Sequence, residues 1–409
     1  MVAHWTPQRR VLVLVGAIVV LDAVFFAALT PMLPYYADRF ELSDTASGIL
    51  SGGYAAGTLA GSLPSGWLGS RIGPRKTVVV GLVVMSMSSL VFAFGNDVVL
   101  LDAARFVQGL AGACSWVGAM GWLLSVTPVS ERGRAIGLIM GLAFSGALLG
   151  PVFGAVAREV GPELPFTVVA GLSMVLLAGT RRTPKPRPSV GATSSLVAAL
   201  RDSAVRLGMW LMVLPAFVSG SLNVLNPLRL DHLGAGGAAI GGTFLIAAAV
   251  QAVGQIFIGR LSDRIGRRIP LLAVLCAGAI LLVLLPRSNA VALFTCLVII
   301  ATACFGVMYT PATALLTDGA EAVGLRQTLG LALVNLTWAG GQSIGALSAG
   351  GVADATPDAA PYLLLAGISA VAVGALLPRE RARAFDRGSE SDARGDEVPE
   401  RSGAASVCR

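Results

Sequence analysis

The sequence predicts an all-α membrane protein in which twelve transmembrane helices form two pseudo-symmetric six-helix bundles. The first observation is composition, since 55% of the 409 residues are hydrophobic and only 13% are charged, which is typical of chains embedded in lipid. The second is a series of apolar runs of about 20 residues, long enough to cross a hydrocarbon core of roughly 30 Å. The third is that two motifs recur in both halves at nearly the same offset, which indicates an internal duplication.

The apolar runs are expected to be helices, because backbone groups in lipid need internal partners and barrel strands span only about 10 residues. The first run follows a short basic segment but lacks a small-residue cleavage site, so it is kept as a span rather than a signal peptide. The expected spans are 11–32, 46–68, 77–96, 98–124, 135–157, 164–180, 208–228, 238–258, 270–286, 290–312, 325–348 and 361–378.

Segment 181–207 is rich in proline and charge and is predicted to be a cytoplasmic linker. It separates an N-terminal bundle, 1–180, from a C-terminal bundle, 208–378. The tail 379–409 has almost nothing to bury and is predicted to be disordered.

Basic residues indicate the orientation in the membrane. When alternate loops are assigned to opposite sides, 25 of the 30 Lys and Arg residues fall on the side that holds both termini. The positive-inside rule therefore predicts that both termini are cytoplasmic in a multi-pass protein. The bias of Arg over Lys favours a GC-rich bacterium, hence its inner membrane. The net charge of +7 follows from these loops, and no nucleic-acid partner is expected.

The repeated motifs lie at matching places in the two halves. Segment 66–76 reads Gly-Trp-Leu-Gly-Ser-Arg-Ile-Gly-Pro-Arg-Lys, and 193 residues later 259–268 reads Gly-Arg-Leu-Ser-Asp-Arg-Ile-Gly-Arg-Arg. A Gly-x-x-x-Gly pair at Gly146 and Gly150 is repeated at Gly341 and Gly345. Both offsets are close to half of the chain, as expected for a duplicated transporter fold.

With these motifs the chain resembles the major facilitator superfamily, and within it the twelve-span drug:proton antiporters. The resemblance implies that the paired loops gate the cytoplasmic side, although Ser70 replaces the acid usual in the first copy. The alternative is that their bases only determine topology. The gating residues implied are Gly66, Arg71, Gly73, Arg75, Gly259, Asp263, Arg264, Gly266 and Arg267.

Two further motifs in the first half carry the resemblance. Span four contains Arg105-Phe-Val-Gln108-Gly-Leu-Ala-Gly, similar to a family motif associated with proton handling. Span five resembles the motif that marks exporters, with Gly146, Gly150, Pro151 and Gly154. For these glycines, close helix packing in lipid is the alternative interpretation.

Asp22 is the main candidate for coupling. It lies 12 residues after Arg10, roughly 18 Å along a helix, which places it near the membrane centre. An acid there is costly and usually functional. Facing a wet cavity, it would exchange a proton for a cationic substrate, because burial favours the protonated acid. A structural hydrogen bond to a neighbouring helix is the alternative.

Arg105 and Gln108 are assigned to proton coupling with Asp22. The alternative for Arg105 is an ion pair with Asp102 one turn earlier. Other polar or aromatic residues inside apolar runs line a central cavity or form interhelical hydrogen bonds. These cavity candidates are Asp22, Tyr54, Trp116, Asn223, Asn226, Gln251, Gln255, Tyr309, Asn335 and Trp338.

The function predicted is proton-coupled export of a small lipophilic or cationic molecule, such as a drug, by alternating access between the two halves. A metabolite or sugar transporter of the same fold, exporting or importing, is the alternative. A membrane enzyme is disfavoured, because the only histidines, His4 and His232, are far apart and no metal or nucleophile motif is present. A sensor would carry a sizeable soluble domain. The proton is the only coupling ion expected, no metal or other cofactor is expected, and the protein is expected to act in the bilayer as a monomer.

Overall fold

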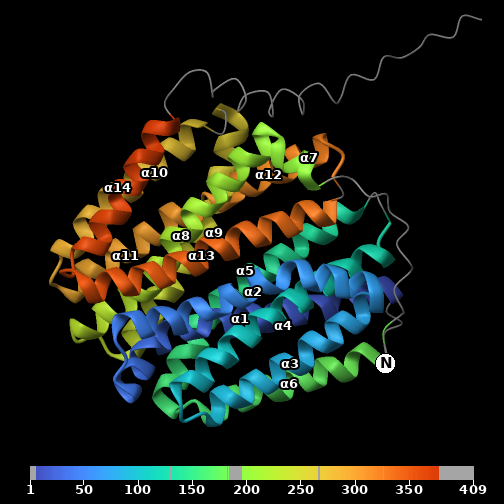
Figure 1. Ribbon diagram of the computed structural model, residues 1–409, viewed down its shortest axis with the longest axis horizontal. Helices are drawn as coiled ribbons and strands as arrows, with labels where there is room; N and C mark the ends of the chain where they lie inside the picture. The colour runs from blue at the N-terminus through green and yellow to red at the C-terminus, as the bar shows by residue number, and fades with distance from the viewer. Residues whose placement is uncertain are drawn as a thin grey trace, which may run out of the picture.

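The computed structural model describes residues 6–128, 131–181, 183, 196–265, 268–325 and 327–376. Within these ranges the chain is built from helices, and it contains no strand. Figure 1 shows the first six helices gathered in one group and the later helices in a second group beside it. The predicted all-α fold is therefore confirmed.

The helices follow the expected spans closely. The first bundle comprises α1 (Pro7–Phe40), α2 (Asp44–Ile72), α3 (Pro74–Phe94), α4 (Val98–Val126), α5 (Arg132–Val160) and α6 (Glu163–Arg181). A short helix, α7 (Leu196–Arg201), comes next. The second bundle comprises α8 (Ser203–His232), α9 (Gly237–Ile265), α10 (Arg268–Leu284), the turn η2 (Leu285–Arg287), α11 (Val291–Gly306), α12 (Tyr309–Ala322), α13 (Gln327–Ala355) and α14 (Ala360–Leu376).

Two regions differ from the expected spans. The run expected at 290–312 forms two helices, because α11 ends at Gly306 and α12 begins at Tyr309. Helix α7 and the first turns of α8 fall inside the expected linker 181–207, whereas residues 182 and 184–195 lie outside the described residues. The expected tail 379–409 also lies outside them, so the domain boundaries remain predictions.

Nine stretches of the described residues are long and apolar enough to cross a membrane. The helices α2, α13 and α14 are not among them. Helix α14 has only 17 residues, and α2 is rich in Gly and Ser. These three helices nevertheless pack inside the same two bundles, where Gly and Ser allow close helix approach.

The helix ends show how the short connections fold. The carboxylate of Asp97 accepts hydrogen bonds from the backbone N–H groups of Val99 and Leu100 and so caps α4. Asp202 caps α8 in the same way. Such caps satisfy backbone donors that the helix itself leaves free.

The duplication is visible in the packing of the bundles. In the first bundle, Gly146 of α5 packs on the carbonyl of Val20 in α1, and in the second, Gly341 of α13 packs on the carbonyl of Val213 in α8. Val20 and Val213 are 193 residues apart, the same offset as the loop motifs. The echoed glycines therefore bring equivalent helices into close contact.

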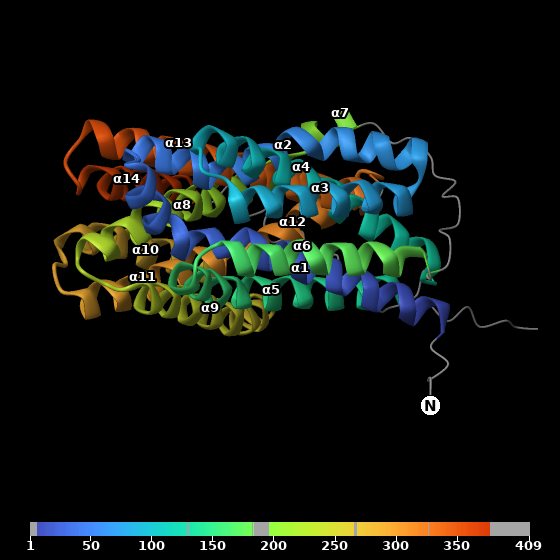
Figure 2. The same ribbon diagram turned by 90° about the horizontal axis from the view of Figure 1, so that it is seen from below.

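The two bundles meet along two seams, α2 against α13 and α5 against α9. We call the end where α1 begins and α6 ends the linker end, and the opposite end, with the α1–α2 and α13–α14 connections, the distal end (Figures 1 and 2). Near the distal end the seams are tight. A Cβ on Gly48 would lie 2.7 Å from the carbonyl oxygen of Ala346, and one on Gly241 would lie 3.1 Å from that of Pro151.

Toward the linker end the described residues show no such contact on the same helix faces. Gly66 lies 18 residues after Gly48, and Gly137 lies 18 residues before Ala155, which packs against α9 at Gly241. A spacing of 18 residues is five helical turns and returns to the same face. A Cβ on Gly66 or Gly137 would nevertheless meet no described atom within 4 Å. Among the described residues the two seams are therefore in close contact at the distal end, and no such contact is found at Gly66 or Gly137 toward the linker end.

Candidate functional site

The site is centred on Asp22, in the middle of α1. The hydroxyl of Tyr54 in α2 donates a hydrogen bond of 2.8 Å to its Oδ2. The other oxygen, Oδ1, is buried and has no hydrogen-bond partner among the described residues. The site therefore holds a carboxylate with one oxygen bonded and one unsatisfied.

Arg105 of α4 lies beside this carboxylate and is only 1% exposed. Its guanidinium donates hydrogen bonds of 2.8 Å to the carbonyl of Phe26 and 2.7 Å to Oε1 of Gln108. It also lies over the ring of Tyr54, 5.2 Å from the centroid. These hydrogen bonds go to α1 carbonyls and to Gln108. The alternative of an ion pair with Asp102 is not observed among the described residues.

Close packing of α2 on α4 places these groups together. Gly57 faces the backbone of α4 and Gly109 faces the backbone of α2, so neither position has room for a side chain. A Cβ on Gly112 would lie 3.1 Å from Oδ1 of Asp22 and 2.5 Å from the hydroxyl oxygen of Tyr54. Gly112 therefore provides the space that the Asp22 and Tyr54 side chains occupy. It belongs to the span-four motif, but the sequence alone does not show what faces it.

The second bundle contributes an aromatic wall. Trp338 of α13 contacts Phe26 of α1 edge to face, with ring centroids 5.5 Å apart. Tyr309 packs on the same core cluster as Trp338, and its hydroxyl donates to Oγ of Ser219 at 3.3 Å. Phe26 in turn packs on Tyr54 at 4.8 Å. Aromatic rings thus connect Asp22 to the second bundle across the interface, and neither Phe26 nor Ser219 is singled out by the sequence.

Other cavity candidates lie inside one bundle. Asn226 is fully buried in the second bundle and accepts a hydrogen bond from Tyr362 of α14. Gln255 donates to the carbonyl of Gly306, where α11 ends, and Gln251 packs against the same glycine. These contacts match the alternative interpretation of interhelical hydrogen bonding. Trp116 packs on a core cluster of the first bundle. Asn223 and Asn335 are partly buried.

The span-five motif has two roles. Gly146, Gly150 and Gly154 all pack against α1, as the packing interpretation expects. Pro151 instead contacts α9 through its carbonyl, opposite Gly241. The motif therefore joins close packing within the first bundle to a contact between the bundles.

The loop motifs are only partly described. In the first copy, Gly73 has φ +86° and ends α2, and Arg71 lies over the ring of Trp67, 4.4 Å from its centroid. Arg75 lines a hollow between α3 and α6 at the linker end. In the second copy, Gly259, Asp263 and Arg264 lie in α9 but their side chains are outside the described residues, as are Gly266 and Arg267 altogether. The gating role stays a prediction.

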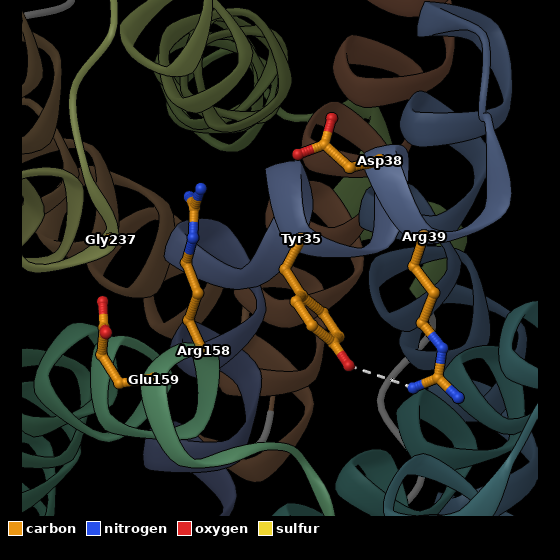
Figure 3. A pocket seen from close by; sticks show the side chains of 6 residues that line it. All are labelled: Tyr35, Asp38, Arg39, Arg158, Glu159 and Gly237. Atoms are coloured by element: carbon orange, nitrogen blue, oxygen red, sulfur yellow. Dashed lines mark hydrogen bonds between the residues drawn. The ribbon is translucent and has the colours of Figure 1, made fainter.

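A charged hollow of about 500 Å³ opens at the distal end between α1, α5 and α9 (Figure 3). Arg39 donates a hydrogen bond to Tyr35 on one side of it. Arg158 and Glu159 extend from α5 on the other. This hollow lies on the closed side of the molecule, away from Asp22.

Together, the fold and the site define a polytopic helical protein of two repeated bundles, with a buried polar cluster in the first bundle that is linked to the second by the Phe26–Trp338 contact. This is the architecture of a membrane transporter. A family model described as Major Facilitator Superfamily matches residues 15–328 and 216–402. The chain therefore belongs to the major facilitator superfamily.

Similar proteins agree with this family. An uncharacterised MFS-type transporter, YcaD, of Shigella flexneri serotype 5b is 28% identical over 270 residues, covering 64% of this chain and 69% of that protein. YcaD of Escherichia coli O139:H28 is 27% identical over 267 residues, with the same coverage. A crystal structure of a bacterial homologue of the human lysosomal transporter Spinster, inward-facing and unoccupied, shares the fold with a TM-score of 0.68 at 16% identity, covering 97% of this chain and all of that one.

Proposed function

We propose that the protein is a proton-coupled exporter of small lipophilic cations that works by alternating access, in a bacterial inner membrane with the linker end in the cytoplasm. The observation that carries this proposal is the half-satisfied carboxylate of Asp22. Its Oδ2 accepts from Tyr54, while its Oδ1 is buried without a partner in the described part of the chain. A buried carboxylate in this state is costly until something neutralises it.

A proton or a cationic group of the substrate supplies the hydrogen-bond donor or positive charge that Oδ1 of Asp22 lacks. Arg105 cannot supply it in this state, because its terminal nitrogens bind α1 carbonyls and Gln108. Since proton and cation neutralise the same oxygen, binding of one displaces the other. This competition is the physical basis of exchange.

The surrounding rings favour a lipophilic cation over a sugar. Tyr54 bonds the carboxylate, Phe26 packs on Tyr54, and Trp338 of the other bundle packs on Phe26. Such rings attract organic cations through their electron-rich faces and bury apolar surface. The open linker end gives a substrate access from the side assigned to the cytoplasm.

The test is accumulation of ethidium in cells that lack their own efflux pumps. Cells that express the chain should accumulate less ethidium than cells without it. A protonophore should abolish the difference. Asp22→Asn should remove the protection at equal membrane abundance, while Asp38→Asn, the same change at an exposed site of the same helix, should keep it.

Unchanged export by the Asp22→Asn protein would overturn the role of Asp22. Export that survives the protonophore would overturn proton coupling. No effect on ethidium or other lipophilic cations, together with transport of a labelled sugar, would favour the metabolite transporter of the same fold.

A further inference from the structure

Polar contacts that cross between the bundles must break when the two halves rock. At the distal end of the α2–α13 seam, the backbone N–H groups of Asp44 and Thr45 each donate a 2.9 Å hydrogen bond to the carboxylate of Asp354. Asp44 and Thr45 form the first turn of α2, and Asp354 lies near the end of α13. A side chain of one bundle thus caps a helix of the other.

We propose that Asp354 is a latch that holds the distal end closed by capping the first turn of α2 across the seam. The first turn of a helix has N–H groups without internal partners and a positive end of the helix dipole, so a carboxylate there is favoured on both counts. Helix α2 already has its own cap in Ser43, which accepts from Ala46. The Asp354 bonds come in addition to that cap and exist only while the bundles touch.

The surroundings fit a contact that forms and breaks. Gly350 of α13 packs directly on the backbone of Asp44, so no side chain separates the two helices at this point. Asp354 lies beyond the expected span 325–348 and is therefore outside the membrane core. Hydrogen bonds from Thr45, Ser43 and Asp44 keep the pKa of Asp354 below its usual value, so it remains a charged acceptor near neutral pH.

A second contact crosses on the other side of the molecule. Arg158 of α5 forms a 2.6 Å ion pair with Asp231 of α8. By contrast, Asp358 pairs with Arg229 at 2.7 Å inside the second bundle. Asp358 is therefore a matched control, because it is an acidic residue at the same end of the molecule and its ion pair stays within the second bundle.

The experiment measures maleimide labelling of purified protein in lipid nanodiscs, where both ends are accessible, with each cysteine read separately by mass spectrometry. One probe is Ser47→Cys, buried at the distal end of α2 and 1% exposed. The other is Gly137→Cys, in α5 toward the linker end, five helical turns from Ala155, which packs on α9. The inference rests on alternating access, part of the proposed function, but the measurement needs no substrate or proton gradient.

Asp354→Ala should raise labelling of Ser47→Cys about fivefold, the population shift expected for loss of a typical helix cap. It should lower labelling of Gly137→Cys, because the linker end closes as the distal end opens. Asp358→Ala should change neither. Asp354→Asn, which keeps one acceptor oxygen, should give a smaller shift and serves if the alanine variant does not fold.

Three results would overturn the latch. Labelling unchanged at both probes in the folded Asp354 variants would show that the contact does not hold the gate. A rise at Ser47→Cys without a fall at Gly137→Cys would indicate local fraying of α2. An equal shift with Asp358→Ala would assign the effect to surface charge.

Discussion

The two bundles share one packing plan but differ in the chemistry of their centres. Helix α5 crosses α1 as α13 crosses α8, with Val20 and Val213 of α1 and α8 193 positions apart. At that offset, Asp22 corresponds to Pro215 and Tyr54 to Ala247. The first bundle therefore contains the acid and its hydrogen-bond donor, while the second presents Trp338 and Tyr309 across the interface.

This difference indicates that duplication preserved the packing of each bundle but not the polar residues at its centre. The glycine contacts that set helix spacing persist in both halves, because each bundle needs them to pack in lipid. Under the proposed function the ionisable group is needed once, since one exchangeable charge per cycle suffices for coupling. We therefore expect substitutions in the first bundle to affect coupling, and substitutions in the second to affect substrate affinity or stability.

Arg105→Lys should cause the largest loss, lowering ethidium export about 100-fold. The guanidinium bonds two α1 carbonyls and Gln108 at once, and a lysine ammonium is a point donor without that fixed fork. Export rates at equal protein abundance measure the effect. Arg39→Lys, at an exposed arginine, should retain export. Near-normal export by Arg105→Lys would contradict the expectation that coupling depends on residues of the first bundle.

Gly112→Ala should lower export about tenfold while the protein still folds. The added methyl would meet both Asp22 and the hydroxyl of Tyr54, and such overpacking typically costs 1–3 kcal/mol unless the two side chains separate. Gly171→Ala in α6, where a Cβ would meet nothing within 4 Å, is the control. If both variants export normally, the space at Gly112 has no part in the site.

The sequence was sufficient to predict the fold, because membrane helices can be recognised by their length and apolar composition. Apart from the run at 290–312, the predicted spans and the helices agree in position, and the resemblance to the major facilitator superfamily is confirmed by the family match. The sequence also selected Asp22, Tyr54 and Arg105, since polar groups inside apolar runs are rare. The structure joins these three residues in one cluster.

The contacts of that cluster were less predictable. In lipid every face of a helix is apolar, so the sequence pattern does not fix how each helix is rotated about its axis. Phe26 is one of many aromatic residues in apolar runs, and Asn226 looks equivalent to Asn223 until its bond to Tyr362 is seen. The capping of α2 by Asp354 joins residues about 310 positions apart and leaves no local signature.

Trp338→Ala should weaken substrate binding about fivefold without changing the response to a protonophore. It removes the ring that contacts Phe26 across the interface, and aromatic contacts of this kind contribute about 0.5–1.5 kcal/mol. The KM for ethidium export should rise while the maximal rate changes little. A loss of proton dependence in this variant would show that the second bundle also takes part in coupling.

Tyr362→Phe should have the smallest effect on transport and a measurable one on stability. The Tyr362 hydroxyl donates to Asn226 inside the second bundle, where Asn226 is fully buried. Removing this donor leaves a buried acceptor unsatisfied, which costs about 1–3 kcal/mol. Thermal unfolding of the purified protein should therefore occur at lower temperature, while export at growth temperature should stay close to that of the parent. If the hydrogen bond instead lined a substrate path, export would fall as much as with Trp338→Ala. The second bundle would then contain a further polar site that takes part in transport.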